Sequence, residues 1–192
     1  MTFAHETVSR DERYHGAIFS VYSDQVTMSD GTTAVRDVVE NQGAVVVVAL
    51  DDSDRVVLIK QYRHPVGRHL WELPAGLRDV AGEDEAVTAA RELAEEADLT
   101  AGRIEPLIDL HTSPGFSDEA VRVFLARDLA PVAETDRHER TAEEADLEVR
   151  RVDLDECVAM VFRGEITNAA AVAGVLAAAR ARDSGWTLLR TA

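Results

Sequence analysis

Glu72-Leu73-Pro74-Ala75-Gly76 and Arg91-Glu92-Leu93-Ala94-Glu95-Glu96 stand on either side of a short loop in this chain. A glycine-containing loop leads into a helix on which three carboxylates share one face. Like charges at helix spacings of three and four residues oppose folding by roughly 0.2–0.5 kcal/mol per pair. A chain that keeps such a cluster beside a glycine loop is therefore expected to use it for cations. We infer a divalent-metal enzyme that acts on a phosphate compound.

The helix that carries these carboxylates is predicted over residues 84–97. Its apolar residues recur at helical spacing and form one stripe; they are Ala86, Ala90, Leu93 and Ala97. Glu83, Asp84 and Glu85 precede or begin the helix, where the helix dipole favours negative charge. This segment is the most strongly patterned in the chain.

The three carboxylates are predicted to lie together, opposite the apolar stripe. At 3.6 residues per turn, Glu96 lies about 40° to one side of Glu92 and Glu95 about 60° to the other. Oxygen ligands without histidine or cysteine favour Mg²⁺ or Mn²⁺ over zinc. The turn at Gly76 lets the Ala75 carbonyl approach the same ions. The alternative is a solvated helix face, which is the usual meaning of a charge run.

Strands are predicted on both sides of this helix. Gly43–Leu50 is a continuous apolar run, which suits a strand buried on both faces, and Arg55–Tyr62 is the return strand of a hairpin. The other predicted strands are 16–22, 34–40, 69–73, 104–111, 120–126 and 147–152. Further helices are predicted from Asp153 to Phe162 and from Thr167 or Asn168 to about Arg182, with a charged, mobile loop over residues 133–146. This order predicts an α/β fold with a mixed sheet and helices on both faces.

Composition restricts the partners. The chain has 192 residues and a formal net charge of −16, which repels nucleic acid. Its longest uncharged apolar run, residues 168–179, is too short for a membrane span, which needs about 20 residues. The single cysteine, Cys157, forms no disulfide within the chain. We expect a cytoplasmic protein with no nucleic-acid or membrane partner, whose anion site contains arginines or metal ions.

The pattern G-x6-E-x7-R-E-L-x-E-E-x-D-L resembles the Nudix box, the signature of the Nudix hydrolase family. The matching residues are Gly76, Glu83, Arg91, Glu92, Leu93, Glu95, Glu96 and Leu99. The chain departs from the box twice: the gap between Gly76 and Glu83 is one residue longer, and Asp98 replaces a glycine at the end of the helix. That position favours a left-handed backbone, which aspartate tolerates better than most residues. The structural residues of the box are Gly76, Glu83 and Arg91, and Arg91 is expected to pair with Glu83 across the loop.

Segments outside the box resemble ADP-ribose pyrophosphatases of this family. They are Trp71–Gly76, Gln61-Tyr62-Arg63, Ser113–Glu119, Gly164–Asn168 and the pair Arg36 and Glu40. The resemblance covers about residues 15–180. It implies the Nudix fold, an α/β/α sandwich with a mixed β-sheet, plus an N-terminal antiparallel strand region. Residues 1–42 would form that region and exchange between the subunits of a homodimer, and residues 43–192 would form the hydrolase domain.

The resemblance also implies the chemistry. The substrate would be ADP-ribose, a nucleotide sugar, hydrolysed to AMP and ribose 5-phosphate. Mg²⁺ held by Glu92, Glu96, Glu95 and the Ala75 carbonyl would bridge the diphosphate and activate water. The general base would come from the later acidic loop, with Glu143 as first choice and Glu144 as second. Ordinary exposed loop residues are the alternative for both.

The substrate-binding residues follow from the same comparison. Arg63 would contact a phosphate, although an arginine at a strand end is otherwise a surface residue. Arg36 and Glu40 would bind the adenine end, and Phe19 would stack on adenine or else belong to the core. The terminal ribose would be contacted by Ser113 and Glu119.

Two alternatives to ADP-ribose hydrolysis remain. One is a Nudix pyrophosphatase for another nucleoside diphosphate sugar or a dinucleotide. The other is a module that senses ADP-ribose without cleaving it. The presence of Glu92, Glu95 and Glu96 favours catalysis.

Overall fold

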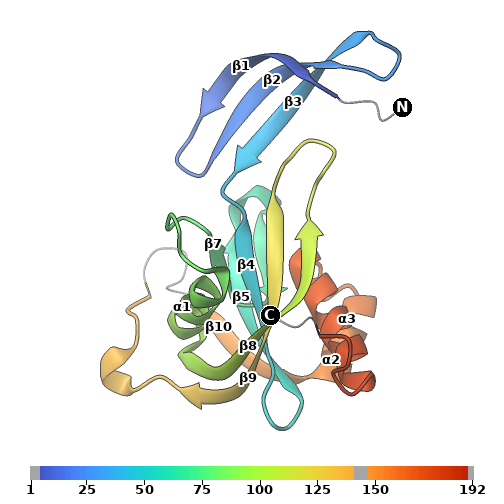
Figure 1. Cartoon of the computed structure of the whole chain (residues 1–192). Coiled ribbons are helices and arrows are strands. Elements are labelled where there is room, and N and C mark those ends of the chain that lie inside the picture. Colours follow the sequence, from blue (N-terminus) through green and yellow to red (C-terminus); the bar gives the residue numbers. More distant parts are fainter. Residues whose placement is uncertain (1–4, 141–146, 190–192) are drawn as a thin grey trace. The chain divides into compact units, whose positions relative to one another are not determined.

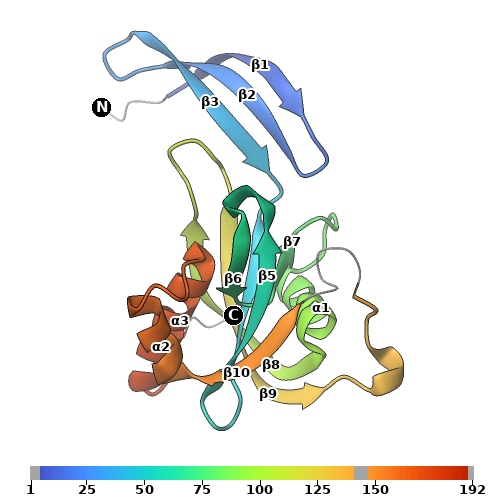
Figure 2. The ribbon, with the colours of Figure 1, turned by 180° about the vertical axis from the view of Figure 1, so that it is seen from behind.

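A computed structural model describes residues 5–140 and 147–189 of the chain. These residues form two compact units (Figures 1 and 2). The first comprises the chain up to Gly43 together with His111–Ala120, and the second comprises Ala44–Leu110 and the chain from Val121 onward. The expectation that residues 1–42 exchange between subunits stays a prediction.

The first unit contains an antiparallel sheet in the order β1-β2-β3. Its strands are β1 (Thr7–His15), β2 (Phe19–Thr27) and β3 (Thr33–Asn41). The sequence missed β1, in which every residue is exposed, because a strand without a buried face has no apolar alternation. β2 starts at Phe19 rather than Gly16, since residues 17 and 18 form a bend.

The second unit contains two sheets. One has the order β7-β4-β9-β8 and the other the order β10-β5-β6. The strands are β4 (Ala44–Ala49), β5 (Arg55–Arg63), β6 (Arg68–Glu72), β7 (Ala75–Leu77), β8 (Leu99–His111), β9 (Ala120–Pro131) and β10 (Glu148–Asp153). β4 runs parallel to β9 and antiparallel to β7, so the predicted mixed sheet is confirmed.

The predicted hairpin of β4 and β5 is wrong. Next to the turn, the isolated bridge between Leu50 and Val56 and the hydrogen bond from the Asp51 N–H to the Arg55 carbonyl join the two segments. β5 pairs along its length with β6 and β10 and not with β4. Asp54, in the turn, has a φ of 55°. Two consecutive strands that are apolar on both faces can belong to two different sheets, and periodicity does not distinguish this from a hairpin.

Helices cover both faces of the second unit, as predicted (Figures 1 and 2). They are α1 (Glu85–Ala97), α2 (Leu154–Phe162) and α3 (Ala169–Asp183). The side chains of Asp84, Asp153 and Asn168 cap their N-termini by accepting backbone hydrogen bonds. In the described part of the chain, no helix has the length and apolarity needed to cross a membrane.

β4 divides the core, as its unbroken apolar sequence predicts. Val45 and Val47 pack in the cluster that includes Leu93 of α1, whereas Val46 and Val48 pack in the cluster that includes residues of α2 and α3. Successive side chains of a strand point to opposite faces, so one strand serves both layers.

The buried face of α1 differs from the predicted stripe. Ala90 is exposed, whereas Ala89, Leu93 and Ala97 are buried. Glu92 and Glu96 lie on this buried side and not opposite it, at 8% and 4% exposure. The helix is therefore turned so that two of the three carboxylates enter the interior, which an assignment based on apolar residues alone does not anticipate.

Candidate active site

α1 approaches strand β7 closely at Gly76. This residue lies on β7 opposite Val45 of β4, on the α1 side of the sheet. A Cβ atom added to Gly76 would stand 2.0 Å from Cδ of Glu92 and 2.1 Å from its Oε1. Real Cβ atoms do not approach other heavy atoms so closely, so a side chain at this position would force the Glu92 carboxylate to move. The box glycine thus makes room for the Glu92 carboxylate.

The neighbouring residue of β7 binds the second buried carboxylate. The backbone N–H of Ala75 donates a 2.7 Å hydrogen bond to Oε2 of Glu96. β7 therefore contacts Glu92 through Gly76 and Glu96 through Ala75. The structure brings three of the predicted metal-site residues, Ala75, Glu92 and Glu96, into one place.

Arg91 links the carboxylates of the box. Its Nη1 lies 2.7 Å from Oε1 of Glu92 and 3.4 Å from Oε2 of Glu95, and its Nη2 lies 3.4 Å from Oε2 of Glu83. The Thr88 hydroxyl also donates a 2.8 Å hydrogen bond to Glu83. The predicted pairing of Arg91 with Glu83 is confirmed.

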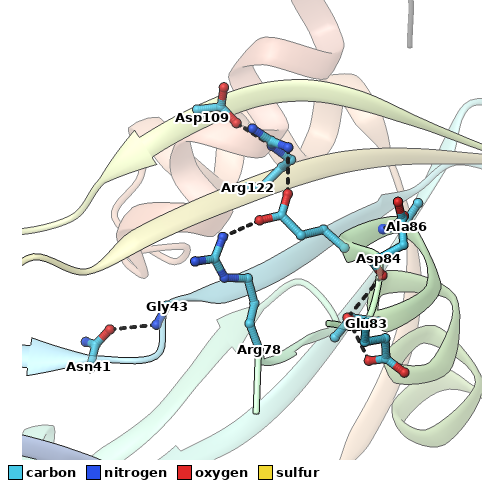
Figure 3. Close-up of polar contacts among 10 residues, drawn as sticks. Asn41, Gly43, Arg78, Glu83, Asp84, Ala86, Asp109 and Arg122 are labelled. Atoms are coloured by element: carbon cyan, nitrogen blue, oxygen red, sulfur yellow. Dashed lines mark hydrogen bonds and ion pairs between the residues drawn. The ribbon is translucent and has the colours of Figure 1, made fainter. Parts of the chain in front are cut away.

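A second set of ion pairs fixes the other end of the loop between β7 and α1 (Figure 3). Arg122 of β9 donates to Glu85 at 2.6 Å and to Asp109 of β8 at 2.7 Å. Arg78, at the start of the loop, also pairs with Glu85. The loop is thus held at its start through Arg78 and at its end through Glu83.

Burial raises the pKa of Glu92, and the adjacent Arg91 partly offsets this increase. Desolvation disfavours the charged form of a carboxyl group unless a cation approaches it. Arg91 is also shared with Glu83 and Glu95. One guanidinium among three carboxylates leaves the group net negative.

The strands beside this group present a charge pair that the sequence did not reveal. Nε and Nη2 of Arg63 donate to the two carboxylate oxygens of Glu72 at 3.0 and 2.8 Å, and Glu72 is only 2% exposed. Val57 of β5 packs in the cluster that includes Leu93 of α1, and Ile59 and Arg63 follow it on the same strand at even spacing. Glu72 of β6 pairs with Ile59. Alternation along the strands therefore places Arg63 and Glu72 on the face towards α1. The glutamate in Trp71-Glu72-Leu73 was the available signal for this pair.

Three of the predicted substrate-binding residues, Phe19, Arg36 and Glu40, lie on strands β2 and β3 of the first unit. Phe19 and Glu40 both line a hollow of about 370 Å³ that also includes His15 and Asn41. Glu40 accepts a 2.7 Å hydrogen bond from Arg10, and Arg36 donates to the Val35 carbonyl.

The segment between β8 and β9 carries the other two predicted contacts. The carbonyl of Ser113 accepts hydrogen bonds from the backbone of Phe116 and Ser117. The Glu119 carboxylate accepts from the Thr112 hydroxyl. The predicted roles of these residues in substrate binding stay predictions.

The two candidates for the general base, Glu143 and Glu144, lie outside the described residues. Arg140, just before this segment, is described. Its guanidinium contacts the C-terminal end of α1.

The donor set of the box fits a hard divalent cation, since its buried ligands are carboxylate oxygens. Within residues 5–140 and 147–189, no three side chains of His, Cys, Asp or Glu lie together as a ready-made metal site. The reason is visible in the contacts: Glu92 is engaged by Arg91, and Glu96 is turned towards Ala75. A cation at this site would compete with Arg91 for Glu92 or use the remaining lone pairs of the two carboxylates.

Comparison with known proteins agrees with this geometry. The NUDIX domain model matches residues 40–173. An ADP-ribose pyrophosphatase of Mycobacterium tuberculosis is 51% identical over 172 residues, which cover 90% of this chain and 82% of that protein. An ADP-ribose pyrophosphatase of Bacillus subtilis is 34% identical over 85% of this chain and 86% of its own length. A crystal structure described as an ADP compounds hydrolase superposes with a TM-score of 0.82 at 21% identity, covering 97% of this chain and 99% of the other.

The chain belongs to the Nudix family and has the Nudix fold. It is a Nudix hydrolase, and its ADP-ribose pyrophosphatase relatives depend on divalent metal ions. The assignment of metal ligands within the box stays a prediction.

Replacing Gly76 with alanine tests the contact with Glu92. We expect Gly76→Ala to lower the free energy of unfolding by about 1–3 kcal/mol, the usual cost of overpacking. Urea unfolding in the presence of EDTA measures this effect. Gly115→Ala is the control, because a Cβ there meets nothing within 4 Å. Adding Glu92→Ala should recover the stability lost by Gly76→Ala, and equal stability of the Gly76 and Gly115 variants would contradict the tight contact.

The raised pKa of Glu92 predicts how stability depends on pH. The folded protein holds the Glu92 proton more tightly than the unfolded chain, so its stabilising effect is complete below the unfolded pKa of 4.5 and is lost as pH rises through the folded value. Glu92→Gln should therefore stabilise the metal-free protein more at pH 7.5 than at pH 4. Thermal unfolding at both pH values measures this difference, with the exposed Glu134→Gln as control. An advantage that is the same at both pH values would show that burial does not govern this group.

Proposed function

We propose that the protein hydrolyses ADP-ribose to AMP and ribose 5-phosphate with Mg²⁺ or Mn²⁺ as the metal. The observation that carries this proposal is the pair of buried carboxylates, Glu92 and Glu96, beside β7 in a Nudix box that keeps its glutamates. The choice of substrate is supported by the 51% identical relative, which is named an ADP-ribose pyrophosphatase.

The metal ligands in this proposal are Glu92, Glu95, Glu96 and the carbonyl of Ala75. A bound divalent cation polarises the diphosphate and lowers the pKa of water. The chain's own contribution is to hold Glu92 and Glu96 one helical turn apart against β7. Burial favours cation binding further, because the ionised Glu92 is poorly compensated by the shared Arg91.

The general base is assigned to the segment after Arg140, with Glu143 first and Glu144 second. A base outside the box leaves Glu92 and Glu96 free to act as ligands. It would take the proton of the attacking water while the box carboxylates remain ionised.

The substrate contacts are assigned as the family resemblance implies. Glu40 and Phe19 line one hollow, which supports a shared role at the adenine end, together with Arg36. Ser113 and Glu119 are assigned to the terminal ribose. Arg63 is assigned to a phosphate, and its Nε and Nη2 donate to the two carboxylate oxygens of Glu72, which fixes the orientation of the guanidinium.

The active assembly is proposed to be a cytoplasmic homodimer in which residues 1–42 exchange. A three-stranded sheet needs an apolar face covered by another layer. Val8 and Val35 of this sheet are 63% and 60% exposed, which supports a covering surface from a second copy.

The decisive experiment is a substrate panel with products identified by mass spectrometry. The purified protein is incubated with ADP-ribose, other nucleoside diphosphate sugars and dinucleotides, with Mg²⁺ or EDTA, in ¹⁸O-labelled water. We expect AMP and ribose 5-phosphate, with ¹⁸O in one of them. Preferred cleavage of another compound would establish the alternative pyrophosphatase. Thermal stabilisation by ADP-ribose without turnover would establish a sensing module.

Glu96→Gln tests the assignment of a metal ligand. We expect turnover to fall about a hundredfold or more, because a neutral amide binds a hard cation poorly. The melting temperature without metal should stay unchanged or rise, since the amide oxygen can still accept from Ala75 and a like charge is removed. Turnover and melting are measured on the same preparation. Activity near that of the unmodified protein would refute the assignment.

Glu143→Gln and Glu144→Gln test the base. We expect Glu143→Gln to lower kcat with the affinities for substrate and Mn²⁺ preserved, because the proton acceptor is lost while the ligands remain. Steady-state kinetics and Mn²⁺ titration measure the two effects. If Glu144→Gln loses kcat and Glu143→Gln does not, the base is the second residue.

A further inference from the structure

The last residue of the Nudix helix has a backbone conformation that is unusual for its type. Asp98 ends α1 with φ 54° and ψ 37°, in the left-handed region, and its N–H bonds to the carbonyls of Ala94 and Leu93. Glycine is the usual residue at such helix ends because other residues carry a steric cost there. The Nudix pattern also has glycine at this position. The aspartate must therefore either be tolerated or contribute something that glycine cannot.

The Asp98 side chain binds Arg140. Nη2 of Arg140 donates to Oδ2 of Asp98 at 2.7 Å, and Nε of the same arginine donates to the carbonyl of Glu95 at 3.1 Å. One guanidinium thus joins the side chain of the residue that ends the helix to a backbone carbonyl of its last turn. A cation is also favoured at this end by the helix dipole.

Burial distinguishes Arg140 from its neighbours. Every residue from Ala133 to Glu139 is exposed, whereas only 22% of the Arg140 side chain is. The stretch that follows β9 therefore returns to the body of the second unit at Arg140. Its contact point is the end of the helix that carries Glu92, Glu95 and Glu96.

We propose that Asp98 and Arg140 form a positioning pair for catalysis. Arg140 is the residue before the segment that carries the proposed base, and the pair fixes the position of Arg140 at the end of the helix. A glycine at position 98 would relieve the backbone but would remove one of the two contacts. This inference rests on the proposed function, because it assigns the pair to the base of that reaction.

The pair orients the proposed base and does not bind the substrate or the metal. Neither side chain belongs to the assigned metal ligands or substrate contacts. Loss of the pair should therefore reduce kcat while KM and the affinity for Mn²⁺ stay the same. Misplacement of a catalytic group by a small distance costs turnover by an order of magnitude or more.

The chain contains a matched control pair. Asp128 also has a left-handed backbone, with φ 57°, and its carboxylate accepts from Arg103 at 2.7 and 3.1 Å. The hydrogen bonds of this second Asp–Arg pair join β8 to β9. This control pair reproduces the backbone strain and the charge pairing of Asp98 between two strands.

The experiment compares Asp98→Gly, Arg140→Gln, Arg140→Lys and the control Asp128→Gly. For each protein we measure kcat, KM, Mn²⁺ affinity and the melting temperature without metal. We expect Asp98→Gly and Arg140→Gln to lose about tenfold in kcat with KM and Mn²⁺ affinity unchanged. Arg140→Lys should recover part of the loss, because lysine keeps the charge opposite Asp98. Asp98→Gly should melt no lower than the unmodified protein, since glycine suits the left-handed position.

Equal kcat for Asp98→Gly and Asp128→Gly would overturn the proposal, as would a loss of kcat accompanied by an equal loss of Mn²⁺ affinity. A fall in kcat that parallels a fall in melting temperature in every variant would indicate a structural role alone. If the unmodified protein cleaves a nucleoside diphosphate compound other than ADP-ribose, the proposed substrate fails and the same comparison is made with that compound. Absence of any turnover by the unmodified protein would overturn both.

Discussion

The contact between β7 and α1 is the constraint on which the site depends. Gly76 leaves room for the Glu92 carboxylate, and the next residue towards the N-terminus, Ala75, binds Glu96 through its backbone. A short strand thereby sets the rotation of the helix about its own axis. The same rotation places Leu93 in the core, so packing and chemistry are determined together.

The charges of the buried carboxylates add a second constraint to the packing of α1. The two buried carboxylates belong to a chain of net charge −16, and the guanidinium of Arg91 is divided among Glu83, Glu92 and Glu95. The resulting deficit of positive charge raises the free energy of the metal-free site. Divalent cations would relieve it, and they would compete with Arg91 for the Glu92 carboxylate. The loop between β7 and α1 limits how far the carboxylates move, because its ends are held through Arg78 and Glu83.

Much of this arrangement is encoded locally and could be predicted. The unbroken apolar run of β4, the capped start of α1 and the pairing of Arg91 with Glu83 all depend on residues close in sequence or on the box itself. The errors arose where tertiary context decides. Ala90 fits a helical stripe but is exposed, since the helix turns to bury carboxylates instead. To predict the pairing of Arg63 with Glu72, the register between β5 and β6 must be known. Alternation within one strand does not supply that register.

Asp98 ends α1 in a left-handed backbone conformation, and this has a consequence for how such proteins diverge in sequence. Aspartate and glycine codons differ by one base at their second position, so the contact between Asp98 and Arg140 can appear or vanish in one step. Glycine suits the same backbone, so that step costs little free energy of folding. Most other changes at a helix end cost more. This position therefore allows lineages to adjust the connection to the following segment without a stabilising substitution elsewhere.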